Sequence, residues 1–289
     1  MQTGNYYTAA SLAEYGIAAL KVVIFGAMLA LLWSLVNRAT RFDDHEELFV
    51  KRNSSYMVQR CGLLLGQGLA MWPLLGSSGR LWFDLAWLVG GGLWAILLLS
   101  ALWPVLNKLV GSGVMTDPSD VTERSTSIVR AAFFVASGLV IGAGVSGEAP
   151  SITIGIISTV VFTLLGLAVL YGSYLINGML PQFDRLGRHV AQGNVAAAII
   201  AAGFTVALGL VLNKAIAGDF ANWGLSLLGF GVTAVVALVG FYAASWLLDR
   251  FIITSATLAQ VVKEDQRLAA TVTATMLVTI AVGVAALPV

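Results

Sequence analysis

The stretch that decides the fold is "QGNVAAAIIAAGFTVALGL", which runs from Gln192 to Leu210. It opens with polar and flexible residues and continues as a run of mostly Ala, Ile, Gly, Val and Leu. A helix of about 20 apolar residues can cross the hydrocarbon core of a bilayer. In lipid, Leu gains nothing hydrophobic by meeting Leu, whereas small residues let two helices approach closely. The stretch therefore predicts a membrane helix that packs tightly against its neighbours.

The whole chain has the composition of a membrane protein. Of its 289 residues, 58% are hydrophobic and 11% are charged, and its mean hydropathy is +0.87. Lys and Arg number 16 against 15 Asp and Glu, so the charge balance argues against nucleic acid as a partner. A single cysteine, Cys61, excludes an intrachain disulfide and a cysteine-based metal cluster. The chain is expected to fold within a bilayer.

Eight stretches are long and apolar enough to be membrane helices, because an uninterrupted apolar segment satisfies its backbone hydrogen bonds in lipid as a helix. The first is longer than the core of a signal peptide and is expected to be retained. The sequence thus predicts an all-α polytopic membrane protein with about eight transmembrane helices. The predicted spans are 13–36, 54–76, 82–106, 127–146, 152–177, 194–213, 223–248 and 267–287.

The connections between these spans predict the orientation of the chain. Most basic loop residues follow the first, third, fifth and seventh spans, and the positive-inside rule places such loops in the cytoplasm. Both termini are then expected outside. The basic residues of these connections are Arg38, Arg41, Lys51, Arg52, Lys108, Arg124, Arg185, Arg188, Arg250 and Lys263.

The chain also contains an internal repeat. A shift of 141 residues, without a gap, lays the first four spans on the last four and matches polar and Trp residues that are rare in this sequence. Two four-helix units, residues 1–146 and 147–289, are predicted. Because each unit has an even number of spans, the two run in the same direction. The matched pairs are Phe42-Asp43 with Phe183-Asp184, Asn53 with Asn194, Gly62 with Gly203, Gly68 with Gly209, Trp82 with Trp223, Glu123 with Glu264, and Gly142 with Gly283.

Two segments resemble a known family. "GNVAAAIIAAG", from Gly193 to Gly203 after the loop "LPQFDRLGRHVAQ", is similar to the YjfL-type family of bacterial inner-membrane proteins, which carries domain of unknown function 350. The segment "EDQRLAATVTATMLVTIAVG", which begins at Glu264, is similar in character. The first half departs from the pattern, with Ser55 and Tyr56 in place of the Ala pair. The resemblance implies a multi-pass protein of the bacterial inner membrane, with undefined biochemistry.

Three basic residues, Lys21, Arg60 and Arg130, fall inside apolar spans, where a charge is costly. Their charged ends can reach the membrane interface. Alternatively, Arg60 and Arg130 face a shared cytoplasmic vestibule and hold an anion or a lipid headgroup. The second half has Ala201 and Thr271 at the matched positions, so such a site would not be symmetric.

Other candidate binding residues lie near the connections. Asn53 and Asn194 start matched spans, and the pairs Phe42-Asp43 and Phe183-Asp184 mark cytoplasmic loops that either form ordinary capped turns or dock a cytoplasmic protein. A last set of small residues recurs on the even-numbered spans and predicts close helix packing, with a permeation path as the alternative. This set comprises Gly62, Gly66, Gly68, Gly138, Gly142, Gly203 and Gly209.

No recognisable catalytic, nucleotide-binding or metal-binding motif appears, so no catalytic residue, metal ligand or cofactor is predicted. We expect a non-enzymatic membrane scaffold or partner-recruiting component, with membrane lipids and a cytoplasmic protein as partners. A channel or facilitator for a small solute or ion is the main alternative. An intramembrane or lipid-modifying enzyme is a third, and assembly into a homo-oligomer is also open.

Overall fold

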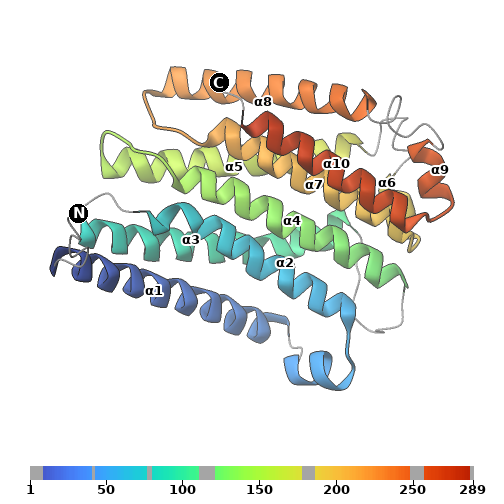
Figure 1. Cartoon of the computed structure of the whole chain (residues 1–289), viewed down its shortest axis with the longest axis horizontal. Coiled ribbons are helices and arrows are strands. Elements are labelled where there is room, and N and C mark those ends of the chain that lie inside the picture. The colour runs from blue at the N-terminus through green and yellow to red at the C-terminus, as the bar shows by residue number, and fades with distance from the viewer. Residues whose placement is uncertain are drawn as a thin grey trace, which may run out of the picture.

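The computed structural model describes residues 9–40, 43–76, 80–110, 121–177, 186–247 and 257–286. These residues form helices and turns, and no strand occurs among them (Figure 1). The all-α prediction is confirmed. The helices are α1 (Ala9–Thr40), the π-helix η1 (Glu46–Val50), α2 (Ser54–Met71), the short 3-10 helix η2 (Trp72–Leu75), α3 (Leu81–Leu109), α4 (Val121–Val145), α5 (Ile152–Asn177), α6 (Leu186–Ala191), α7 (Val195–Ile216), α8 (Trp223–Leu247), α9 (Leu258–Lys263) and α10 (Arg267–Ala285).

Four of these helices form a central row in the order α2, α4, α7, α10, and the most extensive contacts in the molecule join each to the next. Successive contacts between α2 and α4 move toward the C-terminus of both helices: Gly62 lies against Ala131, and Leu69 lies against Gly142. The same holds between α4 and α7, where Ala136 lies against Gly209 and, further along, Leu139 accepts a hydrogen bond from Asn213. The central row is therefore parallel, and α1, α3, α5 and α8 pack on it from outside (Figure 1).

Glycines set the spacing in this row. A Cβ added at Gly62 would lie 2.5 Å from the Cα of Ala131, and one at Gly203 would lie 2.6 Å from the Cα of Ala274. Gly66 and Gly138 lie so close that a Cβ at Gly138 would strike the carbonyl of Gly66. Only glycine permits such an approach of two backbones, which increases the dispersion contacts that hold helices together in lipid.

Seven of the helices are long and apolar enough to span a membrane, one fewer than predicted. The exception, α2, ends at Met71 rather than at residue 76 and carries Gln59, Arg60 and Gln67. It nevertheless crosses the bundle from end to end, packed against α1, α3 and α4 (Figure 1). The architecture is that of a multi-pass membrane protein. The seven segments are Glu14–Ala39, Leu81–Leu109, Thr122–Val145, Ile152–Ile176, Val195–Ile216, Trp223–Ala243 and Arg267–Ala285.

The bundle has two unlike ends. One end, which we call the short-helix end, holds η1, α6 and α9, and every helix of the central row begins there (Figure 1). The other, the pocket end, holds Gly76, Arg80 and the connections 146–151 and 217–222.

The repeat is present, but its last helix is shifted relative to the predicted register. The equivalent contacts Gly62 with Ala131 and Gly203 with Ala274 equate Ala131 with Ala274, which lie 143 rather than 141 residues apart. The predicted pairing of Gly142 with Gly283 is wrong, because Gly142 packs on α2 whereas a Cβ at Gly283 would meet nothing within 4 Å. The pairing of Glu123 with Glu264 fails for the same reason: Glu123 lies in the first turn of α4, and Glu264 ends α9.

Candidate functional site

A buried polar cluster lies at the short-helix end of the first repeat. We call it the Arg60 cluster. Nη2 of Arg60 donates to Oδ1 of Asn37 at 2.6 Å and to the hydroxyl of Tyr56 at 2.5 Å, and lies 3.3 Å from Oδ1 of Asp44. Asn37 and Tyr56 also donate to the carboxylate of Asp44. Its members come from α1, the turn before η1, and α2, and are Trp33, Asn37, Asp44, Tyr56 and Arg60.

Arg60 is only 2% exposed. Within the described residues, its Nε and Nη1 have no hydrogen-bond partner. The guanidinium carbon instead lies 4.8 Å from the ring centre of Tyr56 and 5.2 Å from that of Trp33, and such cation–π contacts gain strength when the cation is desolvated. Because breaking a buried charge pair is strongly destabilising, Arg60 locks these elements together.

The Arg60 cluster fixes the start of η1 through Asp44. Glu47 connects η1 to the residues that follow it, because its carboxylate accepts from Nδ2 of Asn53 at 3.1 Å and from Nζ of Lys51 at 2.8 Å. Hydrogen bonds to Glu47 and Glu46 raise the pKa of Lys51 above its ordinary value. With both sides tethered, η1 holds Phe49 at the surface.

The second repeat begins its central helix in the same way and anchors it differently. Oδ1 of Asn53 accepts from the backbone N–H of Tyr56 at 3.0 Å, and Oδ1 of Asn194 accepts from that of Ala197 at 2.7 Å, so both asparagines are N-caps. In place of a buried cation, the second repeat has Ala201, which is itself buried.

Asp265, which the sequence did not single out, completes this second anchor. Nδ2 of Asn194 donates to the carbonyl of Val262, and Asp265 accepts from the N–H of Ala196 at 2.8 Å and from Arg267 at 2.9 Å. Burial alone would raise the pKa of Asp265, but these donors outweigh it and hold the pKa below its ordinary value. Asp265 also has φ of 49°, a conformation that Asp tolerates better than most residues.

The other intramembrane charges are also buried and have partners of their own. Lys21 in α1 and Asp84 in α3 form an ion pair of 3.1 Å near the pocket end, and Lys21 also donates to the carbonyl of Gly76. Arg130 interacts with Glu123 of its own helix, α4. Arg60 and Arg130 thus have different charged neighbours, and a shared anion site stays a prediction. The sequence analysis did not pair Lys21 with Asp84, although their similar depth in two spans was a signal that could have identified the pair.

The predicted loop residues are only partly within the described chain. Asp43 accepts from the backbone N–H of His45 at 2.9 Å and so caps the turn into η1. Phe42, Phe183 and Asp184 lie outside the described residues.

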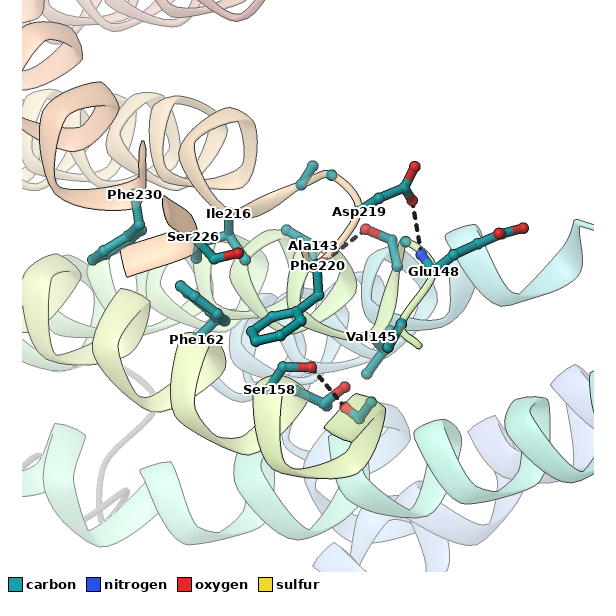
Figure 2. Close-up of a pocket in the computed structure, with 18 of the residues that line it drawn as sticks. Ala143, Val145, Glu148, Ser158, Phe162, Ile216, Asp219, Phe220, Ser226 and Phe230 are labelled. Atoms are coloured by element: carbon teal, nitrogen blue, oxygen red, sulfur yellow. Dashed lines mark hydrogen bonds between the residues drawn. The ribbon is translucent and has the colours of Figure 1, made fainter. Parts of the chain in front are cut away.

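A cavity of about 230 Å³ lies at the pocket end, where the two repeats meet (Figure 2). The inter-repeat connection and the α7–α8 connection are joined above it, because Glu148 N–H donates to Asp219 at 2.8 Å and Phe220 N–H to the Glu148 carbonyl at 2.9 Å. Figure 2 shows the rings of Phe162 and Phe220 beside Ser158 in its lining. A second cavity of about 620 Å³ adjoins it, with Arg80 and Asp84 in its wall.

The chemistry of the described residues is that of packing and anchoring. No group of three or more His, Cys, Asp or Glu side chains that could hold a metal ion occurs among them. The sequence model of the family described as Domain of Unknown Function (DUF350) matches the chain twice, over residues 9–145 and 151–287. No curated protein and no solved structure matches the chain significantly.

Proposed function

We propose that this chain, which belongs to the DUF350 family and contains two tandem copies of its domain, is a non-enzymatic membrane scaffold. Its short-helix end is presented to a protein partner. Lys51, Arg188 and Lys263 lie at this end, so the positive-inside rule favours a cytoplasmic location for it. The resemblance to the YjfL-type family supports a bacterial inner membrane as the setting.

The observation that carries this proposal is the close packing of the central row. At the joint between the repeats, a Cβ at Gly209 would lie 2.7 Å from the Cα of Ala136, and the neighbouring Val140, Ala207 and Val211 are buried and apolar. Close backbone contact of this kind suits a rigid frame better than a water-filled path between the repeats.

The Arg60 cluster supports a presenting role for the short-helix end. A buried cation, held by two helices and a turn, is a costly way to fix a five-residue π-helix at the surface. Exposed polar side chains such as His45, Glu46 and Arg188 lie at the same end and are suited to contact a cytoplasmic protein.

A channel or facilitator remains the second candidate, because one observation favours it. The cavity between the repeats at the pocket end is lined in part by Ser158, Thr159, Ser226 and Thr233, which could solvate a small polar solute. The two candidates differ in whether this cavity continues through the row.

Reconstitution into liposomes separates the two candidates. The purified chain is expected to leave proton, potassium and small-solute fluxes at the level of protein-free liposomes. Flux above that level, abolished by Ser158→Phe and Ser226→Phe in the cavity wall, would establish the channel and overturn the scaffold.

Site-specific photo-cross-linking in intact cells tests the presenting end. A photoreactive residue at His45 and another at Arg188 are expected to capture the same protein. The matched control is Leu225, which is exposed at the pocket end. Capture of that protein from Leu225 as well, or of no common protein from the two test positions, would count against a docking surface at the short-helix end.

A further inference from the structure

The central row ends in two faces that no other part of the described chain covers. One is on α2, where Met57, Cys61 and Leu65 are exposed, and the other is on α10, where Leu268, Val272 and Thr279 are exposed. We propose that these faces are the two halves of one interface, so that α10 of one copy packs on α2 of a second copy and continues the row. This inference does not depend on the proposed scaffold function.

The template for this interface lies within the chain, where α7 of the second repeat packs on α4 of the first. Three contacts define the joint from the short-helix end to the pocket end. Ser125 donates to the carbonyl of Val190 at 2.7 Å, Gly209 lies against Ala136, and Nδ2 of Asn213 donates to the carbonyl of Leu139 at 2.8 Å. This joint is as extensive as the contacts within each repeat.

The repeat relates each helix of this joint to a helix with an exposed face: α7 is equivalent to α2, and α4 is equivalent to α10. The matched N-caps Asn53 and Asn194 set the shift for the α6–α7 region at 141 residues. The matched contacts Gly62 with Ala131 and Gly203 with Ala274 set it at 143 for α4 and α10. The three internal contacts then become Phe49 with Leu268, Gly68 with Thr279, and Trp72 with Val282.

The residues that this translation selects are exposed in the part of a single copy that the structure describes. Phe49 is 71% exposed, Trp72 74%, Leu268 87% and Val282 52%. A Cβ at Gly68 would meet only the ring tip of Phe25, at 3.7 Å, although the equivalent Gly209 is in tight backbone contact. The face of α4 that the second repeat covers therefore has an equivalent on α10 that no described residue covers, and the same is true of the matching face of α2.

The chemistry of the two faces is suited to burial against each other. Phe49 with Leu268 and Trp72 with Val282 replace two hydrogen-bonded contacts of the internal joint by apolar ones. On α10, the hydroxyls of Thr271, Thr275 and Thr279 each donate to a carbonyl of their own helix, at 2.9 Å. A second helix can cover them without leaving a hydroxyl unpaired.

The direction of the helices permits this contact in one bilayer. Because α4 and α7 are parallel, a copy of their joint makes α10 and α2 of two molecules parallel, and both molecules then cross the membrane in the same orientation. The contact is head-to-tail, so each copy uses its α10 face to bind one neighbour and its α2 face to bind another.

The lone cysteine provides the test. Cys61 is equivalent to Ala202, and the spacing of the Gly209 contact with Ala136 places Ala202 opposite Val129, whose equivalent on α10 is Val272. Two differently tagged chains are co-expressed, one with only Cys61 and one carrying Cys61→Ala with Val272→Cys. Membranes are oxidised with copper phenanthroline, and a disulfide between the two tags is expected.

Two controls decide the outcome. Val235→Cys with Cys61→Ala presents a cysteine on the exposed face of α8, and it should cross-link to Cys61 at least about tenfold less. Adding Gly68→Leu should lower the Cys61–Val272→Cys product by a similar factor, because it overpacks the proposed contact. Gly90→Leu on α3, where a Cβ would meet nothing within 4 Å, should not lower it.

The proposal is overturned by no disulfide between the tags, by equal linkage from Val235→Cys, or by a Gly68→Leu chain that cross-links as well as the parent. The yield of folded Gly68→Leu protein, measured by size-exclusion chromatography, shows that a lost cross-link is not lost folding. A cross-link that forms while His45 and Arg188 capture nothing leaves self-assembly standing and the partner-docking function rejected.

Discussion

The short-helix ends of the two repeats begin alike and are held differently. Asn53 and Asn194 cap α2 and α7 with the same hydrogen bond. Beyond the cap, the first repeat uses the buried charge of Arg60, and the second uses Asp265 in the turn between α9 and α10. The parts that pack the bundle are therefore duplicated, whereas the parts that shape its short-helix end are specific to each half.

The largest loss of folded protein is expected from changes to the glycine contacts that the two repeats share. Gly62→Leu and Gly203→Leu each force a side chain into the backbone of the neighbouring central helix, and either should leave little folded protein. Fluorescence-detected size-exclusion chromatography measures the folded yield. Gly240→Leu in α8, where a Cβ would meet nothing within 4 Å, is the matched control. A folded yield near that of the control for either variant would contradict a shared packing frame.

Arg60→Met should cause the second-largest loss of stability, and it should affect the first repeat alone. It keeps the apolar stem but leaves Asp44 without its cation, at a cost of roughly 3 kcal/mol in unfolding free energy. Thermal unfolding in detergent measures the loss.

Asp44→Asn in the same chain serves as the second half of a double-mutant cycle. The two changes together should cost less than their sum, because each removes the same ion pair. Strict additivity would show that Arg60 and Asp44 do not act as a unit.

The two caps offer a comparison in which the repeats should respond equally. Asn53→Ala and Asn194→Ala each remove a side-chain acceptor from a helix N-terminus, which costs about 1 kcal/mol. Asn→Ser at either position keeps a side-chain acceptor for the helix N-terminus and should restore part of the stability. The measurement is again thermal unfolding, and a loss at only one of the two positions would break the equivalence of the repeats.

The smallest loss of stability is expected for Asp265→Asn, at neutral pH, and it should vanish in acid. Because the pKa of Asp265 is lower in the folded chain than in the unfolded one, ionised Asp265 stabilises the fold above the unfolded value of about 4. That contribution disappears as the pH falls through the folded pKa. Asp265→Asn should therefore be less stable than the parent at pH 7 and equal to it near pH 2, as measured by thermal unfolding across that range. A difference that does not change with pH would exclude the charge as the cause.

The sequence predicted the architecture because membrane insertion imposes strong constraints on it. Apolar stretches of helical length, a small-residue pattern at Gly62 and Gly203, and polar matches between the halves were enough for an all-α repeated bundle. The exception was α2, whose hydropathy is lowered by Gln59, Arg60 and Gln67. These side chains lie on its buried face, where α4, α1 and α3 give them partners.

The candidate site was harder to predict because its partners are distant in sequence. Arg60 was visible as a charge in an apolar span, but Asn37 and Asp44 reach it only after α1 and α2 have folded together. The register of α10 failed because an ungapped comparison cannot detect two extra residues before that helix. Asp265 was hidden because its role depends on the backbone of Ala196, which no side-chain pattern reveals.

The parallel central row has a consequence for how the chain is made. Each repeat crosses the bundle four times, so α5 starts at the same end as α1 and the second repeat needs no reversal. By the positive-inside rule, one orientation then suits the basic connections of both repeats. The protein can therefore have a doubled structure and still carry the buried charge of Arg60 in the half that is synthesised first.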